Sequence, residues 1–80
     1  MKRKREIGQH LISDPEVCHG QLTFKGTRLL VRPVLAYIAA GKSMNWVLSE
    51  WPRLRQEAVE EALRLAVDAL IERYEIKPAA

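Results

Sequence analysis

Three breaks in the sequence, at Pro33, at Gly41 with Ser43, and at Pro52, limit the second half of the chain to two short helices and one long one. Pro33 suits the first position of a helix, because its missing N–H has no partner there, and the chain before it is pushed into an extended conformation. Gly41 can end that helix as a left-handed residue. Ser43 is the expected N-cap of a second helix, which Pro52 stops. This spacing predicts a mainly α protein.

The last helix is predicted from near Arg55 to about Tyr74, and it is apolar over a wide arc. At about 100° per residue, one side collects Val59, Ala62, Leu63, Ala66, Val67, Leu70 and Tyr74, and the flanks add Ala58, Leu65, Ala69 and Ile71. The charged side chains share roughly a third of the circumference, which we interpret as a solvated face: Glu57, Glu60, Glu61, Arg64, Asp68, Glu72 and Glu75.

So wide an apolar arc needs more than one neighbour. We therefore predict an interface with a second copy of the chain or with a partner protein, formed by Leu65, Ala69, Ile71 and Tyr74. The alternative is that the N-terminal part of the chain folds back and covers this helix.

The N-terminal part predicts a short β element. Candidate strands cover residues 7–12 and 22–24, and the turn-forming run Ser13–Glu16 lies between them. A hairpin-like turn at Lys25–Gly26 then returns the chain through Arg28–Leu30. The predicted fold is a short N-terminal β element followed by three helices, of which the second and third are spaced as in a helix-turn-helix.

Eighty residues make one small domain, for which we expect a basic N-terminal tail at 1–6, the domain at 7–76 and a C-terminal tail at 77–80. The single Cys18 cannot form an internal disulfide, and Cys18 with His19 is too few for a structural zinc site. We therefore expect no metal or cofactor, added stability from self-association, and a reducing cytoplasm. The basic start has no apolar region after it, so no secretory signal is expected, and the longest apolar run, Val34–Ala40, is too short to cross a bilayer.

Charge is segregated along the chain. Residues 19–55 contain six cations and only one acid, Glu50, whereas residues 56–80 contain six acids and three cations. A polyanion would be attracted to the first segment and repelled by the second.

The sequence does not predict an enzyme. His10 and His19 have no partners at a useful spacing, Ser13 and Ser43 fit turn or cap positions, and no glycine-rich phosphate loop occurs. The carboxylates gather only on the solvated face of the last helix.

Residues 11–66 resemble the family catalogued as domain of unknown function 433, whose members are often described as antitoxins of the VapB type. The matching residues, in the family's order and spacing, are Asp14-Pro15, Gly20, Gly26-Thr27-Arg28, Val31, Gly41, Ser43, Trp51-Pro52, Leu54, Val59 and Ala62-Leu63. The resemblance implies a small bacterial or archaeal protein with a homeodomain-like helix-turn-helix. It also implies a neighbouring toxin with a PIN-like nuclease fold, which the antitoxin would bind while repressing their shared promoter.

Arg55 is the departure from the family pattern that matters most. Members commonly have Thr or Ser there as the N-cap of the third helix, with an acidic residue close behind. An arginine cannot accept the free N–H groups of the first turn, and its charge opposes the helix dipole, a loss of about 1 kcal/mol. Either Arg55 contacts DNA, or the helix begins at Pro52 and Arg55 is a solvated residue of its first turn.

The residues predicted to contact DNA follow from a helix-turn-helix, in which the start of the third helix enters the major groove. They are Lys42, Ser43, Asn45, Arg53, Arg55 and Gln56. Lys25 and Arg28 are assigned either to DNA contact or to stabilising the turn, with Lys25 exposed at its tip and Arg28 tied to a helix C-terminus or a carboxylate. Gly26 and Thr27 are assigned to the turn itself.

The sequence thus predicts a cytoplasmic, dimeric, DNA-binding antitoxin that neutralises a nuclease toxin. Two alternatives stay open: a stand-alone transcriptional regulator, and a protein-interaction module without DNA binding, which the acidic last helix favours.

Overall fold

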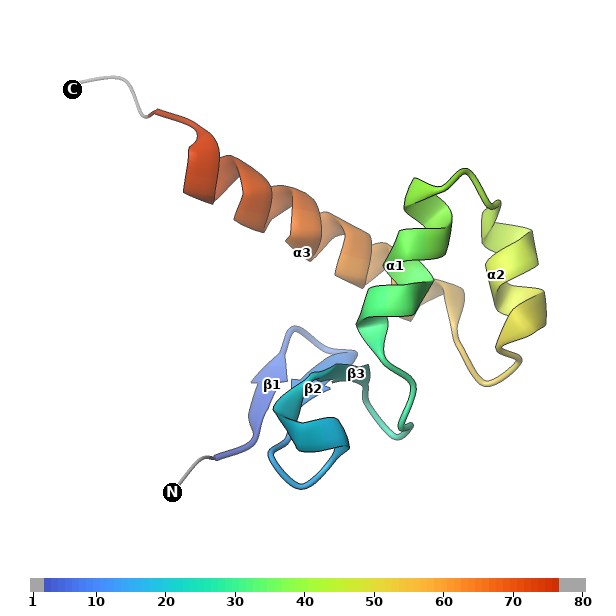
Figure 1. The fold of residues 1–80 in the computed structure, drawn as a ribbon, viewed down its shortest axis with the longest axis horizontal. Helices are drawn as coiled ribbons and strands as arrows, with labels where there is room; N and C mark the ends of the chain where they lie inside the picture. The colour runs from blue at the N-terminus through green and yellow to red at the C-terminus, as the bar shows by residue number, and fades with distance from the viewer. Residues whose placement is uncertain (1–2, 77–80) are drawn as a thin grey trace.

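The computed structural model describes residues 3–76, and it has the mainly α architecture that the sequence predicts (Figure 1). Three short strands, β1 (Arg5–Ile7), β2 (Leu11–Ser13) and β3 (Leu22–Phe24), come first, with a 3-10 turn, η1 (Cys18–Gly20), before β3. Three helices follow: α1 (Val31–Ala39), α2 (Met44–Glu50) and α3 (Gln56–Tyr74). Within the described part of the chain, no helix combines the length and the apolar character needed to cross a bilayer.

The three strands form an antiparallel sheet in the order β1-β2-β3. The prediction of one strand over 7–12 is wrong, because Gly8 adopts a φ of +62° and turns the chain between β1 and β2. The hairpin-like turn after β3 is confirmed: Gly26 has a φ of +76°, and Leu30 returns to pair with Thr23. β1 begins inside the segment predicted as an N-terminal tail, and the predicted tail at 77–80 lies outside the described residues.

α1 begins at Val31, so Pro33 is its third residue and not its first. The N–H groups of the whole first turn lack helical partners, which lets a proline occupy any of those positions. Gly41, with a φ of +100°, ends the helix as predicted. The Gly41 amide donates to the Ile38 carbonyl and the Lys42 amide to the Tyr37 carbonyl, each at 3.0 Å. These are the two hydrogen bonds of a Schellman motif.

The two remaining helix starts agree with the sequence. The Ser43 hydroxyl accepts a hydrogen bond from the Trp46 amide at 3.0 Å and so caps α2. α3 begins at Gln56, which makes Arg55 its N-cap residue, and the Arg55 side chain makes no capping bond. The alternative start of this helix at Pro52 is therefore wrong.

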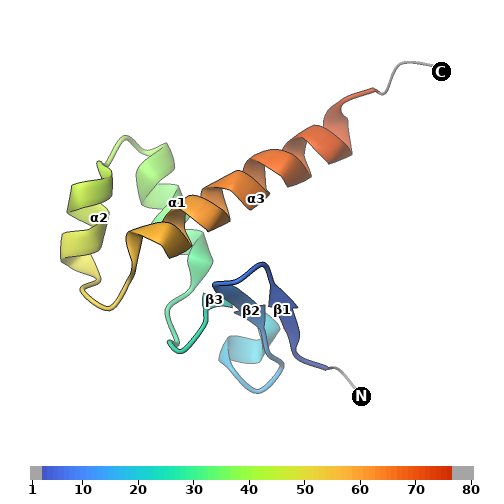
Figure 2. The same ribbon diagram turned by 180° about the vertical axis from the view of Figure 1, so that it is seen from behind.

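The core lies where the sheet, α1 and the first half of α3 meet, with α1 in contact with α2, α3 and β3. Its buried residues are Leu11, Phe24, Val31, Val34, Val47, Leu54, Ala58, Val59 and Ala62. None of them lies beyond Ala62, so α3 leaves the core at about its middle and projects from the rest of the fold (Figure 2). We call residues 66–74 the outer half of α3.

Candidate nucleic-acid and partner interfaces

Two arginines that are far apart in the sequence meet between the β3–α1 loop and the α2–α3 turn. They line a groove of about 560 Å³ formed by Thr27, Arg28, Leu29, Glu50, Trp51, Pro52 and Arg53. We call this the arginine groove. A neighbouring hollow of about 520 Å³ shares Thr27, Arg28 and Arg53 with it. Arg28 and Arg53 are exposed, and within residues 3–76 neither guanidinium makes an ion pair or a hydrogen bond.

The β3–α1 loop is held in shape by Thr27. Its hydroxyl donates to the Phe24 carbonyl at 2.7 Å and accepts from the Leu29 amide at 3.0 Å. Thr27 and Gly26 therefore stabilise the turn, as predicted. Arg28 lines the groove beside the C-terminal end of α2, but its side chain is not tied there by a hydrogen bond or ion pair to any described residue. The cation is thus presented at the surface by a rigid turn.

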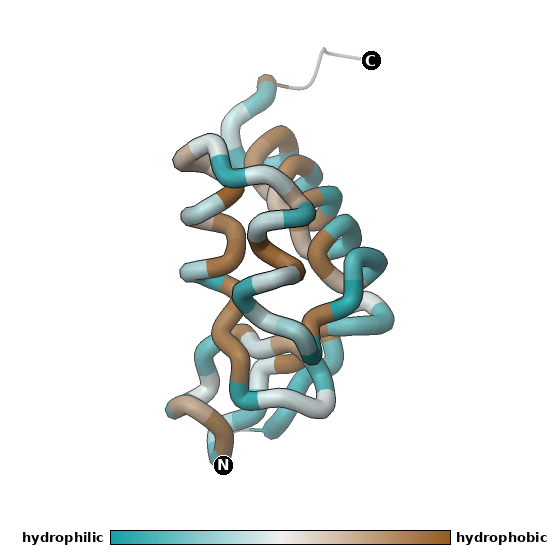
Figure 3. Tube along the Cα trace, turned by 90° about the vertical axis from the view of Figure 1, so that its right-hand side faces the viewer, coloured by the Kyte–Doolittle hydropathy of each residue, from teal (hydrophilic) through white to brown (hydrophobic). Residues whose placement is uncertain are grey.

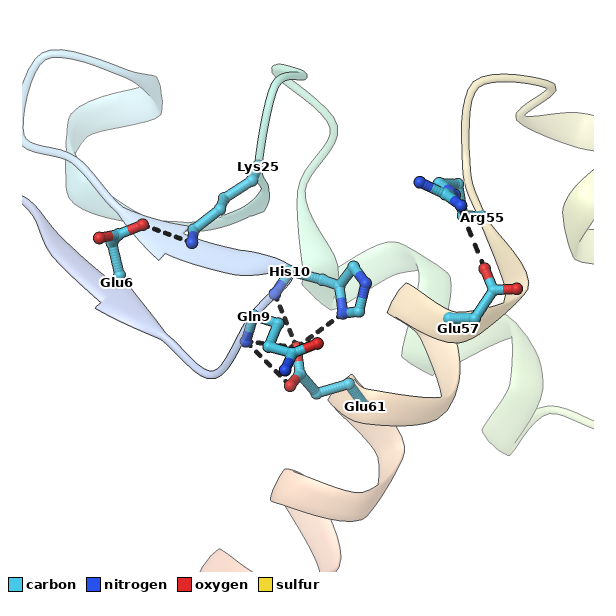
Figure 4. Close-up of polar contacts among 7 residues, drawn as sticks. All are labelled: Glu6, Gln9, His10, Lys25, Arg55, Glu57 and Glu61. Carbon is cyan, nitrogen blue, oxygen red and sulfur yellow. Dashed lines mark hydrogen bonds and ion pairs between the residues drawn. The ribbon is translucent and has the colours of Figure 1, made fainter.

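Lys25 is half-buried and is not the free residue at the tip of the turn that the sequence suggested. Its ammonium group forms an ion pair with Glu6 on β1 (Figure 4). The hydrogen bond and charge of Lys25 lower the pKa of the Glu6 carboxyl below its usual value. Of the two roles predicted for Lys25, the structure favours stabilisation of the β element.

The six residues predicted to contact DNA form two groups at opposite ends of α2 (Figure 1). Lys42, Ser43 and Asn45 lie at its start, whereas Arg53, Arg55 and Gln56 follow its end. Arg53 alone among them lines the arginine groove.

Four of these six residues interact within the chain. Lys42 lies over the Trp46 ring, 4.8 Å from its centroid, and Ser43 caps α2. Arg55 Nε lies 3.7 Å from a carboxylate oxygen of Glu57, and the Gln56 side-chain amide donates to Glu60 at 3.2 Å. The exposed start of α3 is therefore bordered by acids that would repel phosphates.

Glu61 holds the sheet against α3, a role that the sequence does not predict (Figure 4). Its carboxylate accepts from the Gln9 amide at 2.9 and 3.0 Å and from the His10 amide at 2.7 Å, and His10 Nδ1 lies 3.0 Å away. We call these contacts the Glu61 clasp. The Gln9 amide is the main cause that lowers the pKa of the Glu61 carboxyl, the His10 amide and ring add to it, and burial opposes it.

Glu61 was assigned to the solvated face of the last helix, and that assignment is wrong because the residue is only 9% exposed. A signal existed in the sequence. Glu61 lies three residues after Ala58 and four before Leu65, both on the apolar arc, so a helix of 3.6 residues per turn places it beside the core. The backbone amides that it binds could not be identified without the β1–β2 turn.

The outer half of α3 exposes four large apolar residues at the spacing of one helical face. Val67 is 58% exposed, Leu70 57%, Ile71 48% and Tyr74 69%. Figure 3 shows the alternation of hydrophobic and hydrophilic residues along this helix. Of the predicted interface residues, Ala69, Ile71 and Tyr74 are exposed, whereas Leu65 is half-buried and packs against the core. The sheet reaches Glu61 but does not cover this outer half, so the alternative of a covering β element is wrong.

Comparison with known protein families gives a match to the segment that contains the arginine groove. The family model described as protein of unknown function (DUF433) matches residues 12–66. No curated protein and no solved structure matches the chain. The matched segment runs from β2 to the end of the buried part of α3 and stops where the outer half begins. Because it spans more than half of the 80 residues, the chain belongs to the DUF433 family of proteins of unknown function.

Proposed function

We propose that this protein binds DNA at one surface and a partner protein at another, as an antitoxin of a type II toxin–antitoxin pair. In this proposal the helices act as a homeodomain-like helix-turn-helix, and the protein represses its own promoter. It neutralises a PIN-like nuclease toxin by direct binding, and it works in the cytoplasm as a homodimer.

The observation that carries the proposal is the separation of the two surfaces. The α2–α3 turn, which forms one wall of the arginine groove, and the outer half of α3 lie at opposite ends of the molecule (Figure 1), whose longest extent is 46 Å. The guanidinium groups of Arg28 and Arg53 pair with no residue of the described part of the chain, and they suit phosphates because a planar fork of donors matches their oxygens. Four exposed apolar residues on one helical face suit a protein. A nucleic acid and a protein could therefore bind at the same time.

The geometry favours the arginine groove as the main DNA contact over the start of α3. Arg55 and Gln56 are engaged with Glu57 and Glu60, and these acids would approach the phosphates together with them. This same acidity supports the second candidate function, a protein-interaction module without DNA binding.

Salt-dependent binding to a duplex of the protein's own promoter tests the DNA half of the proposal. Arg28→Gln and Arg53→Gln should each weaken binding and lower the slope of log affinity against log salt by about 1. Arg64→Gln is the matched control, because it removes the same charge from an exposed position on α3 outside the groove. Equal effects of all three substitutions on duplex binding would exclude the arginine groove as the DNA contact. If the wild type does not bind the duplex, the result favours a protein-interaction module without DNA binding.

Inhibition of the nuclease encoded beside this gene tests the protein half. Leu70→Gln should reduce inhibition about tenfold or more, whereas Glu72→Gln on the charged side of the same helix should not. Because Leu70 is exposed, the free energy of unfolding of the Leu70→Gln variant should differ from that of the wild type by no more than about 0.5 kcal/mol. If Leu70→Gln instead converts a dimer to a monomer and leaves inhibition intact, the outer half is a self-association surface. DNA binding without any effect on the nuclease would favour the stand-alone regulator.

A further inference from the structure

The arginine groove contains more than two cations, because most of its surface is apolar. Leu29 from the β3–α1 loop, and Trp51 and Pro52 from the α2–α3 turn, line it together with the two arginines. Its volume of about 560 Å³ lies within the range of about 300–1,000 Å³ of small-molecule sites, which also combine apolar walls with a few polar groups. A phosphate backbone has no apolar surface to bury against these walls.

Trp51 is held in place at this groove. Its ring centroid lies 5.9 Å from that of Tyr37 on α1, with the two ring planes inclined at 52°. The Trp51 amide donates to the Val47 carbonyl at 3.1 Å, and the Trp51 carbonyl accepts from the Leu54 amide at 2.9 Å. The hydrogen bonds fix the backbone, and the ring contact limits the rotation of the side chain. An ordered, half-buried indole of this kind can serve as a platform on which an unpaired base stacks.

The groove also contains a carboxylate that the fold does not use. Glu50 is the last residue of α2, is exposed, and lines the groove with Arg28 and Arg53. Neither arginine forms an ion pair with it, nor does any other residue in the described part of the chain. The groove therefore presents hydrogen-bond donors and an acceptor separately. A ligand that satisfies both must carry an anion and hydrogen-bond donors of its own.

We infer that the arginine groove binds a nucleotide outside a base pair, within a single-stranded segment of nucleic acid. The inference rests on the proposed nucleic-acid binding at this groove. The guanidinium groups of Arg28 and Arg53 contact phosphate oxygens of the strand, and the base lies against Trp51. Glu50 accepts a hydrogen bond from the edge of the base. Each chemical feature of the groove then has a partner on one ligand.

An unpaired nucleotide fits these features better than a fully paired duplex or an acidic peptide does. The donors on the Watson–Crick edge of a base are engaged in a duplex and free in a single strand. Stacking within a duplex also keeps the faces of the bases away from an indole, and Glu50 would then meet phosphates, which it repels. An acidic peptide would bring further carboxylates to Glu50.

The first test uses Trp51 as its own reporter. In a Trp46→Phe variant Trp51 is the only tryptophan, and a base stacked on it quenches its fluorescence. One strand of the promoter should quench Trp51, and the fully paired promoter duplex should quench it much less. At equal salt, the strand should bind several-fold more tightly than the duplex. Deoxyribose and ribose strands of the same base sequence separate DNA from RNA as the source, and tighter binding of either one than of the duplex supports the inference.

The second test changes the groove and follows binding by the anisotropy of a labelled strand or duplex. Trp51→Leu should weaken strand binding about tenfold, because leucine keeps an apolar contact but has no π face. Trp46→Leu is the matched control, since Trp46 does not line the groove. Glu50→Gln should strengthen duplex binding by removing a charge that repels phosphates, and should reduce the preference for the strand. Glu72→Gln, on the outer half of α3, should change neither. The unfolding midpoint of each variant shows whether the fold is kept.

The outcomes separate this inference from the proposed function. If strand and duplex bind equally without quenching, and Arg28→Gln weakens both, the groove contacts phosphates only; the inference fails and the proposed function stands. If the strand binds with quenching and the duplex does not bind, the inference holds and promoter repression fails. If the wild type binds neither, both fail. Equal quenching by oligoglutamate would assign the groove to an acidic peptide and overturn the inference.

Discussion

Gly8 and Gly26 both have left-handed backbone conformations, and of the two Gly8 is the one packed against another part of the chain. A Cβ on Gly8 would lie 2.5 Å from a carboxylate oxygen of Glu61, whereas a Cβ on Gly26 would have no atom within 4 Å. Both alanine substitutions should lose about 1–2 kcal/mol for the unfavourable φ. Gly8→Ala should lose more, because the carboxylate must move off the Gln9 and His10 amides.

Urea denaturation of both variants measures this difference, and Gly26→Ala serves as the control for the backbone effect alone. Equal losses in the two variants would contradict the close approach of Gly8 to Glu61.

The residues that the sequence assigned correctly are those whose role is local. Ser43 caps a helix, Gly41 ends one and Thr27 bonds its own turn, so a few neighbouring residues suffice to predict each role. Glu61 is different, because its partners lie more than fifty residues away. Its three polar contacts depend on the position of the whole hairpin, which no local pattern contains.

The start of α3 is a poorly capped helix end. Arg55 offers no acceptor to the first turn, and its exposed pair with Glu57, at 3.7 Å, adds little. Arg55→Ser should raise the free energy of unfolding by about 1 kcal/mol, because the hydroxyl can cap the helix and a charge opposed to the helix dipole is removed.

Chemical denaturation measures the gain, and Ser43→Ala at the cap of α2 should lose a similar amount in the same assay. An Arg55→Ser variant no more stable than the wild type would mean that another group satisfies the first turn of α3.

The helices could be predicted because their ends carry the signals, and the sequence also predicts β3 at Leu22–Phe24. The first two strands could not be separated, because each has only three residues and no alternation is long enough to show that β1 ends at Ile7 and β2 begins at Leu11. Pro33 places the predicted start of α1 two residues too late, because proline is tolerated throughout the first helical turn and does not mark one position in it.

The stability of the molecule in acid depends on carboxylates that join its parts. The pKa of Glu61 lies below its ordinary 4.5 in the folded protein, so the clasp stabilises fully above that pH and is lost as the pH falls through the lowered pKa. Glu61→Gln should therefore be less stable than the wild type at pH 7. The difference should shrink below pH 4.5.

Urea midpoints recorded from pH 7 down to pH 2.5 check this expectation. Glu6→Gln is the companion variant, since Lys25 lowers the pKa of Glu6 in the same direction. Parallel curves for the wild type and Glu61→Gln would mean that the carboxylate contributes no ionised contact to the fold.

The separation of charge and apolar surface across the molecule was predictable, but the composition of each surface was not. Composition alone distinguished a basic middle from an acidic, apolar end. The arginine groove needs the β3–α1 loop to meet the α2–α3 turn, which depends on how α1 packs between them. For the same reason Lys42, equally basic in the sequence, lies at the far end of α2.

The Glu61 clasp has a consequence for the arginine groove. The sheet leads through the β3–α1 loop to Arg28, α3 follows soon after Arg53, and the clasp is a polar link between the β1–β2 turn and α3. While the clasp is closed, it limits how far these two parts of the groove can move apart. In the proposed DNA complex, the two guanidinium groups would then meet a phosphate backbone as one preorganised set, so that less conformational freedom is lost on binding. A carboxylate that touches no ligand would thereby strengthen the contacts of two cations that it does not touch.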